Sequence, residues 1–223
     1  MLLNESKFAQ IKLDAVFHVG TLDAAQKGTY HRRSQEGNGL SVSLHPHEWA
    51  QIAELGGCRL YRLEKPDGVF LDYHRITPRL RRALEAWTLD QGWAQLGTRW
   101  RVEWYDSEQA DRRYLLVESQ EAAQAEFGSF VGDASATMKP VQVFCATAKL
   151  IERIGFAPDP IETLDLTTTC WVEDCTALDG VWWEDTLSPD DLSAPRGVIN
   201  LKSLPAWTVL DQGPLYLSSE HPV

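Results

Sequence analysis

The succession of short apolar segments constrains the fold of this chain more than any other feature. Most of these segments are a few residues long and end at turn signals such as "KPDG" at residues 65–68. "LSVSL" at residues 40–44 alternates cleanly, so its apolar side chains share one face of a strand and Ser41 and Ser43 share the other. Expected strands outnumber expected helices and follow no regular order, which predicts an α+β domain and not a doubly wound sheet.

The expected elements follow from periodicity and from turn and capping residues. Strands are predicted at residues 13–19, 40–44, 58–63, 69–72, 99–105, 114–118, 164–171, 180–184, 198–201 and 207–210. Helices are predicted from Pro46 to the glycines at 56–57, from Pro78 to Gly97 at the latest, and at 121–127. Residues 141–154 are expected to be helical or mixed, and residues 185–197 to form a loop.

Length and charge narrow the class of protein. A chain of 223 residues suits one domain spanning 1–223, and it is long enough to bury roughly 70% of its unfolded surface. The net charge of -11 repels phosphate backbones, so generic nucleic-acid binding is not expected. Two short basic stretches, residues 31–35 and 77–84, are interpreted as a solvated loop and a solvated helix face.

Cysteine and histidine usage gives further expectations. The four cysteines form no Cys-x-x-Cys pair, the N-terminus is polar, and no apolar run reaches about 18 residues. The simplest interpretation is a cytoplasmic protein with reduced thiols and no membrane partner. His45 and His47 flank a proline that begins a predicted helix, so their rings should diverge, and no metal site is expected.

Two polar groups at strand ends are candidates for ligand binding. His18 ends a predicted strand and is followed by Gly20 and Thr21, a pattern that can bond a sugar hydroxyl while backbone comes close. The alternative is a half-buried histidine with satisfied hydrogen bonds beside a glycine turn. Ser41 and Ser43 could hold ligand hydroxyls, or they could line the solvent-facing side of an edge strand. The polar loop between the two groups carries Tyr30 and two arginines, which suit a ligand with a ring, a ribose and phosphates.

This order of pieces resembles the N-terminal half of the ADP-ribosyltransferase fold, and in particular the small rifamycin ADP-ribosyltransferases. The pieces are a strand, His-x-Gly-Thr, a polar loop, a strand ending in hydroxyls, a helix, and a strand at "RLYRLEKPDGVFLD", residues 59–72. The resemblance covers about residues 13–75. One residue, Val19, separates His18 from Gly20, where the family has His-Gly-Thr without a break.

The resemblance implies two small sheets, mixed and antiparallel, with flanking helices around a cleft that binds NAD as substrate. It implies that His18, with Gly20 and Thr21 beside it, holds the nicotinamide-side ribose. Tyr30 or Trp49 would flank the nicotinamide, and Ser43 would support the site from the second strand. Independently of the family, Arg196 in "LSAPRG" could pair with a pyrophosphate, or it could bond a backbone carbonyl or a carboxylate.

The resemblance also implies a carboxylate later in the chain that binds the ribose 2′-hydroxyl, and a fixed negative charge there suits the positive charge that develops as nicotinamide leaves. Glu184 in "GVWWED" is the first candidate, since it follows two tryptophans and precedes a long polar stretch. Asp72 in "FLDYH" is the second candidate, because the compact rifamycin-type enzymes carry an acid near that place, and Glu118 is the third. The alternative for Glu184 is a solvent-facing acid after a buried tryptophan pair.

Three functional hypotheses remain open at this level. The first is an ADP-ribosyltransferase that cleaves NAD and transfers ADP-ribose to an unknown acceptor, as a toxin, a defence effector or a drug-modifying enzyme. The second is a catalytically inactive module of the same fold that binds a nucleotide or a protein. The third is a toxin-neutralising or structural protein whose acidic surface binds a basic partner.

Overall fold

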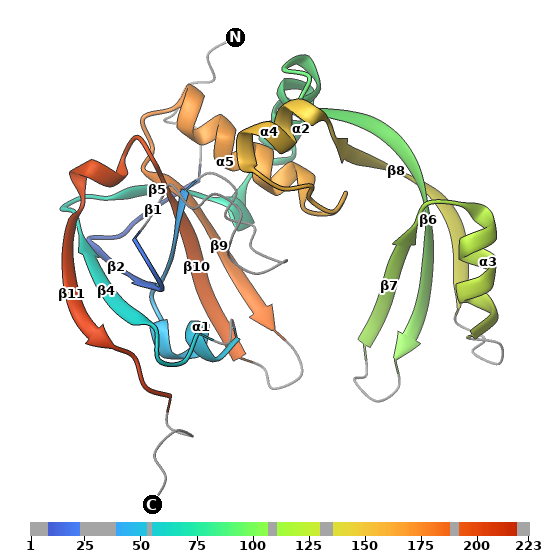
Figure 1. The fold of residues 1–223 in the computed structure, drawn as a ribbon. Coiled ribbons are helices and arrows are strands. Elements are labelled where there is room, and N and C mark those ends of the chain that lie inside the picture. Colours follow the sequence, from blue (N-terminus) through green and yellow to red (C-terminus); the bar gives the residue numbers. More distant parts are fainter. Residues whose placement is uncertain are drawn as a thin grey trace, which may run out of the picture.

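Two separate β-sheets and a group of helices near their junction make up the structure, so the α+β class is confirmed (Figure 1). The computed structural model describes residues 9–22, 39–52, 55–106, 111–129, 136–187 and 192–217. None of the described helices has the length and apolar character needed to cross a membrane.

The larger sheet has eight strands within the described ranges. In spatial order they are β1 (Gln10–Lys12), β5 (Val69–Asp72), β9 (Gly180–Leu187), β10 (Leu192–Asn200), β3 (Gly39–Ser43), β2 (Ala15–Val19), β4 (Arg59–Glu64) and β11 (Thr208–Pro214). Neighbouring strands are antiparallel except β5 and β9, which are parallel. Strands from both ends of the chain therefore meet at the centre of this sheet.

The sheet curls around one of its two apolar faces. Phe70 on β5 packs against Trp207, whose ring centroid lies 5.9 Å away, although Trp207 precedes β11 at the opposite edge of the sheet. The two edges thus close over a shared core, which contains Val16, Leu40, Val42, Leu63, Phe70, Trp182, Ile199 and Trp207. We call this side the inner face.

Helices cover the other face of the sheet, here called the outer face. Its main core contains Leu71, Leu80, Leu84, Trp171, Val172, Leu178, Val181, Trp183 and Val198. The helices there are α2 (Pro78–Asp90) and α5 (Thr163–Cys175) near one end of the strands, and α1 (Pro46–Ile52) near the other end (Figure 1). The short turns η2 (Tyr73–Arg75) and η3 (Leu204–Ala206) complete the connections.

Helix α2 confirms the capping prediction. The Thr77 hydroxyl accepts a hydrogen bond from the Leu80 backbone N–H at 3.2 Å, and Pro78 occupies the first turn, where no N–H is needed. Leu80 and Leu84 lie one turn apart and enter the outer-face core. The helix ends at Asp90, before Gly97, the last position at which the sequence predicted its end.

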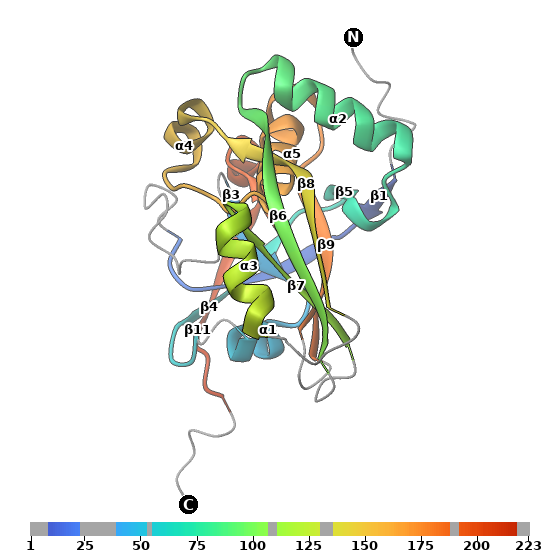
Figure 2. The same ribbon diagram turned by 90° about the vertical axis from the view of Figure 1, so that its right-hand side faces the viewer.

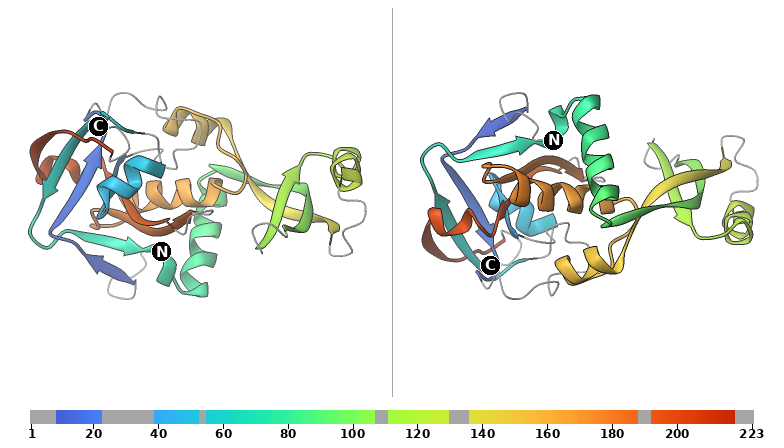
Figure 3. Two further views of the ribbon diagram at one scale, coloured as in Figure 1. Left: turned by 90° about the horizontal axis from the view of Figure 1, so that it is seen from below. Right: turned by 90° about the horizontal axis from the view of Figure 1, so that it is seen from above.

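The smaller sheet forms an arm that projects from the body (Figures 1 and 3) and lies in front of the body in the view of Figure 2. Its strands are β7 (Asp111–Val117), β6 (Ala94–Asp106) and β8 (Thr137–Ala146) in spatial order, with α3 (Gln120–Ser129) packed on one side. The arm is rooted where β6 begins and β8 ends: Thr147 donates from its backbone N–H to the Trp93 carbonyl at 3.0 Å. At this root, Trp93 packs with α4 (Ala148–Ile154) and α5.

The strand predicted at residues 164–171 is wrong, because these residues belong to α5. The prediction follows the high β-propensity of threonine. In the helix, the buried Thr167, Thr168 and Thr169 donate their hydroxyl hydrogens to carbonyls three or four residues earlier, at 2.7–3.0 Å. These bonds satisfy polar groups that would otherwise be buried without partners, so tertiary burial overrides the local preference.

The loop predicted at residues 185–197 is also wrong for most of the segment. Strand β9 continues to Leu187 and β10 already begins at Leu192, so the two strands form a long hairpin. The mixed character expected of residues 141–154 is confirmed, since β8 is followed by α4.

The buried carboxylate of Asp179 links three segments of the chain at one end of the curled sheet. It accepts a hydrogen bond from the Val69 backbone N–H at 2.7 Å, pairs with Lys65, and accepts a hydrogen bond from the Ser203 hydroxyl. These partners come from the β4–β5 turn, the start of β5 and the segment after β10. One buried charge therefore joins three segments at the same end of the sheet.

We expect Gly180→Ala to disrupt this sheet. A Cβ at Gly180 would lie 1.8 Å from the Val198 carbonyl oxygen on the paired strand, and backbone cannot move aside without breaking the β9–β10 register. The expected destabilisation is about 1–3 kcal/mol or more, measured as the free energy of unfolding in urea.

The matched control is Gly128→Ala in α3, where an added Cβ meets nothing within 4 Å. This change should be neutral or stabilising by up to about 1 kcal/mol, because alanine loses less backbone entropy in a helix than glycine. Equal unfolding free energies for the two variants would contradict the close approach of β9 and β10 at Gly180.

Candidate functional site

A row of side chains crosses three central strands on the outer face. Arg196 on β10 pairs directly with Ser43 on β3 and with Trp183 on β9. Directly paired residues of neighbouring strands point to the same side of a sheet, so these three side chains are neighbours. Ser43 also pairs with Phe17 on β2, which extends the row to a fourth strand. Residues separated by about 150 positions in the sequence are therefore brought together.

Arg196 is the centre of this row. Its side chain is 7% exposed, and its guanidinium carbon lies 5.3 Å from the ring centroid of Trp49 and 6.0 Å from that of Trp183. Trp49 comes from α1, which Pro46 starts shortly after β3, so the short helix places its ring above the strand ends. The guanidinium thus makes cation–π contacts with two indole rings, and a planar cation is of the chemical type that pairs with a flat or anionic group.

Glu162, the residue before α5, is a carboxylate in the field of Arg196. Burial is the main cause that raises the pKa of Glu162, and the neighbouring Asp159 and Asp165 carboxylates raise it further. The Arg196 guanidinium acts in the opposite direction. We call Ser43, Trp49, Glu162, Trp183 and Arg196 together the Arg196 site.

A second acid–aromatic pair adjoins the Arg196 site. Tyr73 lies 5.9 Å from Trp183, centroid to centroid, and its hydroxyl donates to the Asp165 carboxylate on α5. Burial raises the pKa of Tyr73, and the charge of Asp165 raises it further, so Tyr73 stays a neutral donor at physiological pH.

Trp183 carries an open hydrogen-bonding position. The side chain is 6% exposed, and within the described residues its indole N–H has no acceptor. Buried donors in folded proteins nearly always have a partner, so this N–H is a candidate contact for an oxygen atom of a ligand.

His18 lies on the other side of the sheet and uses both ring nitrogens within the fold. Nδ1 is 2.7 Å from the Ser41 carbonyl oxygen and Nε2 is 2.9 Å from the Thr21 carbonyl oxygen. The ring stacks on Tyr61, its cross-strand partner on β4. Both carbonyls only accept hydrogen bonds, so a sugar hydroxyl can reach His18 only if one of these contacts is released.

The residues after His18 complete this arrangement. Gly20 has a φ of 139°, a conformation that glycine adopts readily and that turns the chain so that the Thr21 carbonyl faces back to the histidine ring. The structure thus uses the Thr21 backbone at this contact. The alternative of a histidine with satisfied hydrogen bonds beside a glycine turn matches this geometry.

The interpretation of Ser41 and Ser43 as the solvent-facing side of an edge strand is wrong. Strand β3 lies between β10 and β2, and both serines are buried. The Ser43 hydroxyl accepts a hydrogen bond from the His45 backbone N–H at 3.0 Å, at the turn that leads into α1. Ser43 therefore connects the row on the outer face with the helix that carries Trp49.

Two of the three predicted catalytic carboxylates, Asp72 and Glu118, lie in different parts of the structure, and neither lies beside Arg196. Asp72 pairs in register with Trp182, a residue of the inner face, while its neighbour Leu71 belongs to the outer-face core. Asp72 thus lies on the side of the sheet opposite Arg196, with the Arg75 side chain 3.5 Å away. Glu118 follows β7 in the arm, is 90% exposed, and lies 3.8 Å from Arg99.

Two predicted site residues are described incompletely or not at all. The backbone of Glu184 pairs with Pro195 in the β9–β10 hairpin, one position beyond the Trp183–Arg196 pair, and its side chain lies outside the described part of the structure. Tyr30 lies outside the described residues.

Comparisons with known proteins give no relative. No protein-family model, no curated protein and no solved structure matches the chain. Within the described residues, no group of three or more His, Cys, Asp or Glu side chains is arranged to hold a metal ion.

Sequence reasoning missed the acidic part of the site. Glu162 and Asp165 are not among the predicted site residues, because the strand predicted at residues 164–171 leaves no helix start at that point. Tyr73 joins them only through its contacts with Asp165 and Trp183 in the folded structure. The signal is present in the sequence: Pro160 precedes the segment, and Leu164, Thr167, Thr168 and Trp171 recur at helical spacing.

We expect Glu162→Gln to change the pH dependence of stability. The folded-state pKa of Glu162 is raised above about 4.5, so the protonated carboxyl contributes stability that is present below that pH and is lost as pH rises through the folded pKa. The variant lacks this loss, and its urea midpoint should fall less than that of the wild type between about pH 4 and pH 8.

Glu121→Gln is the control of opposite sign. A hydrogen bond from its own backbone N–H, at the first turn of α3, and a bond with Ser119 lower the pKa of Glu121. Its contribution is present above the unfolded pKa and is lost as pH falls, so removing it should cost stability at neutral pH. Identical pH slopes for wild type and Glu162→Gln would contradict the placement of Glu162.

Proposed function

We propose that the chain binds NAD at the Arg196 site and acts as an ADP-ribosyltransferase. The observation that carries the proposal is the convergence of Ser43 and Trp49, which the family resemblance suggests, with Arg196, which "LSAPRG" suggests independently. The α+β class of the structure is the class to which the ADP-ribosyltransferase fold belongs.

The chemistry of the Arg196 site fits the parts of NAD. The guanidinium suits an oxygen pair of the pyrophosphate, and the flanking rings of Trp49 and Trp183 suit the adenine or nicotinamide ring. The Trp183 indole N–H and the Ser43 hydroxyl add hydrogen-bonding groups for ribose or phosphate oxygens.

The reaction breaks the bond between nicotinamide nitrogen and ribose carbon, and nicotinamide leaves with the electron pair. A nucleophilic oxygen or nitrogen of the acceptor, or of water, forms the new bond to that carbon and loses its proton to solvent. A carboxylate is needed beside the ribose to stabilise the positive charge in the transition state. We assign this role to Glu184, the first candidate from the sequence, as the hypothesis to test. Its strand position is one residue beyond the Trp183–Arg196 pair, where strand alternation changes side, so the backbone register gives no preference for Glu184 over Asp72.

In this proposal His18 is a positioning residue. Its ring links β2, through the Ser41 carbonyl, to the strand that carries Ser43, and it also holds the Thr21 backbone. The same observation favours a second candidate function, a module that binds a nucleotide without cleaving it, because a histidine engaged in this way does not contact the sugar.

We expect Arg196→Met to weaken NAD binding, measured by calorimetry, by at least about tenfold, since a charged hydrogen bond contributes about 1.5–3 kcal/mol. Methionine keeps the length and apolar stem of the side chain, so the fold should persist. Arg82→Met on α2 is the control, because Arg82 is exposed and lies outside the row of side chains that contains Arg196. Its NAD affinity should equal that of the wild type.

Nicotinamide release, followed by chromatography in the same samples, separates the two functions. Release by the wild type and its loss in Glu184→Gln, with NAD affinity retained, supports the transferase. Binding without release supports the non-catalytic module. Absence of NAD binding by the wild type overturns both.

A further inference from the structure

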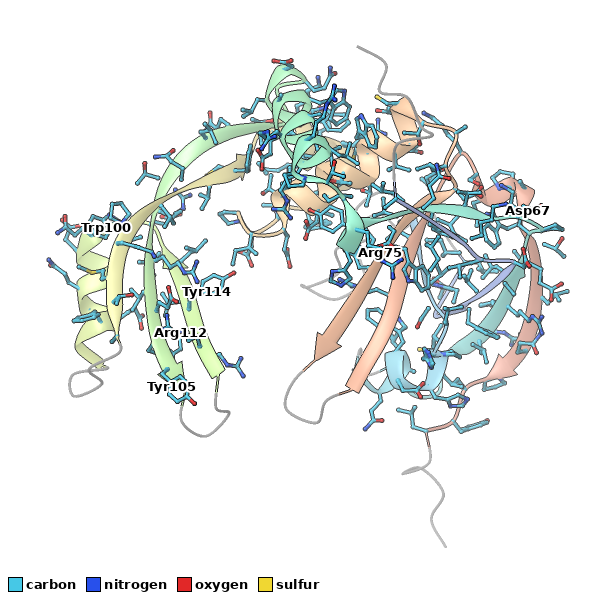
Figure 4. All side chains as sticks on the ribbon, turned by 180° about the vertical axis from the view of Figure 1, so that it is seen from behind. Asp67, Arg75, Trp100, Tyr105, Arg112 and Tyr114 are labelled. Atoms are coloured by element: carbon cyan, nitrogen blue, oxygen red, sulfur yellow. The ribbon has the colours of Figure 1, made fainter. Side chains whose placement is uncertain are left out.

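The arm has two faces of different character. Val102 on β6 and Ala123 on α3 are fully buried, so α3 covers the face of the sheet that Val102 shares with Trp100. Figure 4 shows Trp100 on the side of α3, whereas Arg112 and Tyr114 point to the opposite side, toward the body. Of the described helices, α3 packs along all three strands of the arm, while α2, α4 and α5 contact β6 or β8.

The face turned away from α3 gathers cations and tyrosines. Strand register places on it Arg99, Arg101, Tyr105, Arg112, Tyr114 and Lys139, together with Glu103, Leu116, Thr137 and Val141. We call this set the open face. Tyr105 is 45% exposed, Tyr114 is 41% exposed, and the Arg112 side chain is 75% exposed.

The open face is positively charged in a chain whose net charge is -11. Among the described residues that the register places there, Glu103 is the acid that accompanies the four cations, and it lies 3.3 Å from Arg101 and 3.5 Å from Arg112. Glu118 reaches Arg99 at 3.8 Å from the end of β7, but it is almost fully exposed, where solvent screens an ion pair strongly. The acids of α3 lie on the covered side of the arm.

The open face also presents flat surfaces for rings. The Arg101 guanidinium carbon lies 4.1 Å from the Tyr114 ring centroid, which joins two planar groups into one platform. Tyr105 pairs in register with Arg112, so a second ring and a second cation are neighbours nearer the tip of the hairpin. Rings interleaved with cations on an open sheet match unpaired bases and the phosphates between them.

We propose that the open face of the arm binds single-stranded nucleic acid. Bases stack on Tyr105, Tyr114 and the Arg101 plane, while Arg112 and Lys139 contact phosphates. An acidic peptide would use the same cations but offers no row of rings, so the tyrosines favour nucleic acid. The expectation from total charge applies to the whole chain, whereas the cations here are concentrated on one face.

The test uses fluorescence anisotropy of labelled single-stranded oligo-uridine and oligo-thymidine with the full chain. The wild type should bind at low salt, and its affinity should fall with salt. Arg112→Glu/Lys139→Glu should weaken binding at least about tenfold and lower the slope of log K against log salt by about 1.4, for two phosphate contacts at about 0.7 each.

The matched control is Arg79→Glu/Arg82→Glu on α2, which makes the same change in net charge at two exposed positions of the body. It should keep most of the affinity. Equal losses in both double variants would show that only total charge matters and would overturn the proposal, as would absence of binding by the wild type at low salt.

The aromatic contribution is tested separately. Tyr114→Leu should lose at least about fivefold in affinity through lost stacking, and Tyr114→Phe should retain it because the ring remains. Unchanged affinity in Tyr114→Leu, together with equal binding of poly-glutamate, would reassign the open face to an acidic protein and contradict the proposal. Arg196→Met should leave oligonucleotide binding unchanged, so failure of this proposal is distinguishable from failure of the NAD proposal.

Discussion

The carboxylate of Asp179 holds together the segments on which the rest of the body depends. A buried charge is tolerated only where hydrogen bonds and an opposite charge replace its lost hydration, and here the partners are Lys65, the Val69 N–H and Ser203. Because these partners lie in separate segments, satisfying the charge also joins the starts of β5 and β9 to the segment that follows β10. The β9–β10 register sets Trp183 beside Arg196. The Asp179 charge thus lies at one end of the two strands that carry Trp183 and Arg196 in their middle.

The parts of the fold that could be predicted are those in which local chemistry and tertiary burial agree. Alternation at residues 40–44 and the Thr77–Pro78 start of α2 predict the strand and the helix that the structure contains. Helix α5 could not be predicted in this way, because its buried threonines prefer strands by propensity and are accepted in a helix through bonds to carbonyls of their own chain. Those bonds depend on burial by neighbouring segments, which periodicity alone does not reveal.

Some residues of the candidate site could likewise be predicted from the sequence, and others could not. Residue type pointed to Ser43 and Arg196, and the resemblance to Trp49; the strand order pairs the first two, and α1 adds the Trp49 ring. Glu162 was not predicted, because the start of α5, which it precedes, was not predicted. The role of His18 depends on the backbone carbonyls of two other residues, and a sequence gives no sign of a carbonyl that faces a ring. Side-chain identity therefore predicted which residues could bind a ligand. Backbone geometry determines which of them already make hydrogen bonds within the fold.

The arm illustrates why net charge is a weak guide to partners. Charges are screened over about 8 Å at physiological ionic strength, so a bound molecule responds mainly to the side chains it touches. Alternation along β6, β7 and β8 sends the arginines and tyrosines of the open face to one side and Val102 to the other. Helix α3 occupies the apolar side, and the polar side, with Arg112 and Tyr114, faces the body (Figure 4). The acidic remainder of the chain then sets the long-range repulsion that any polyanion must overcome, which makes binding at the open face strongly dependent on salt.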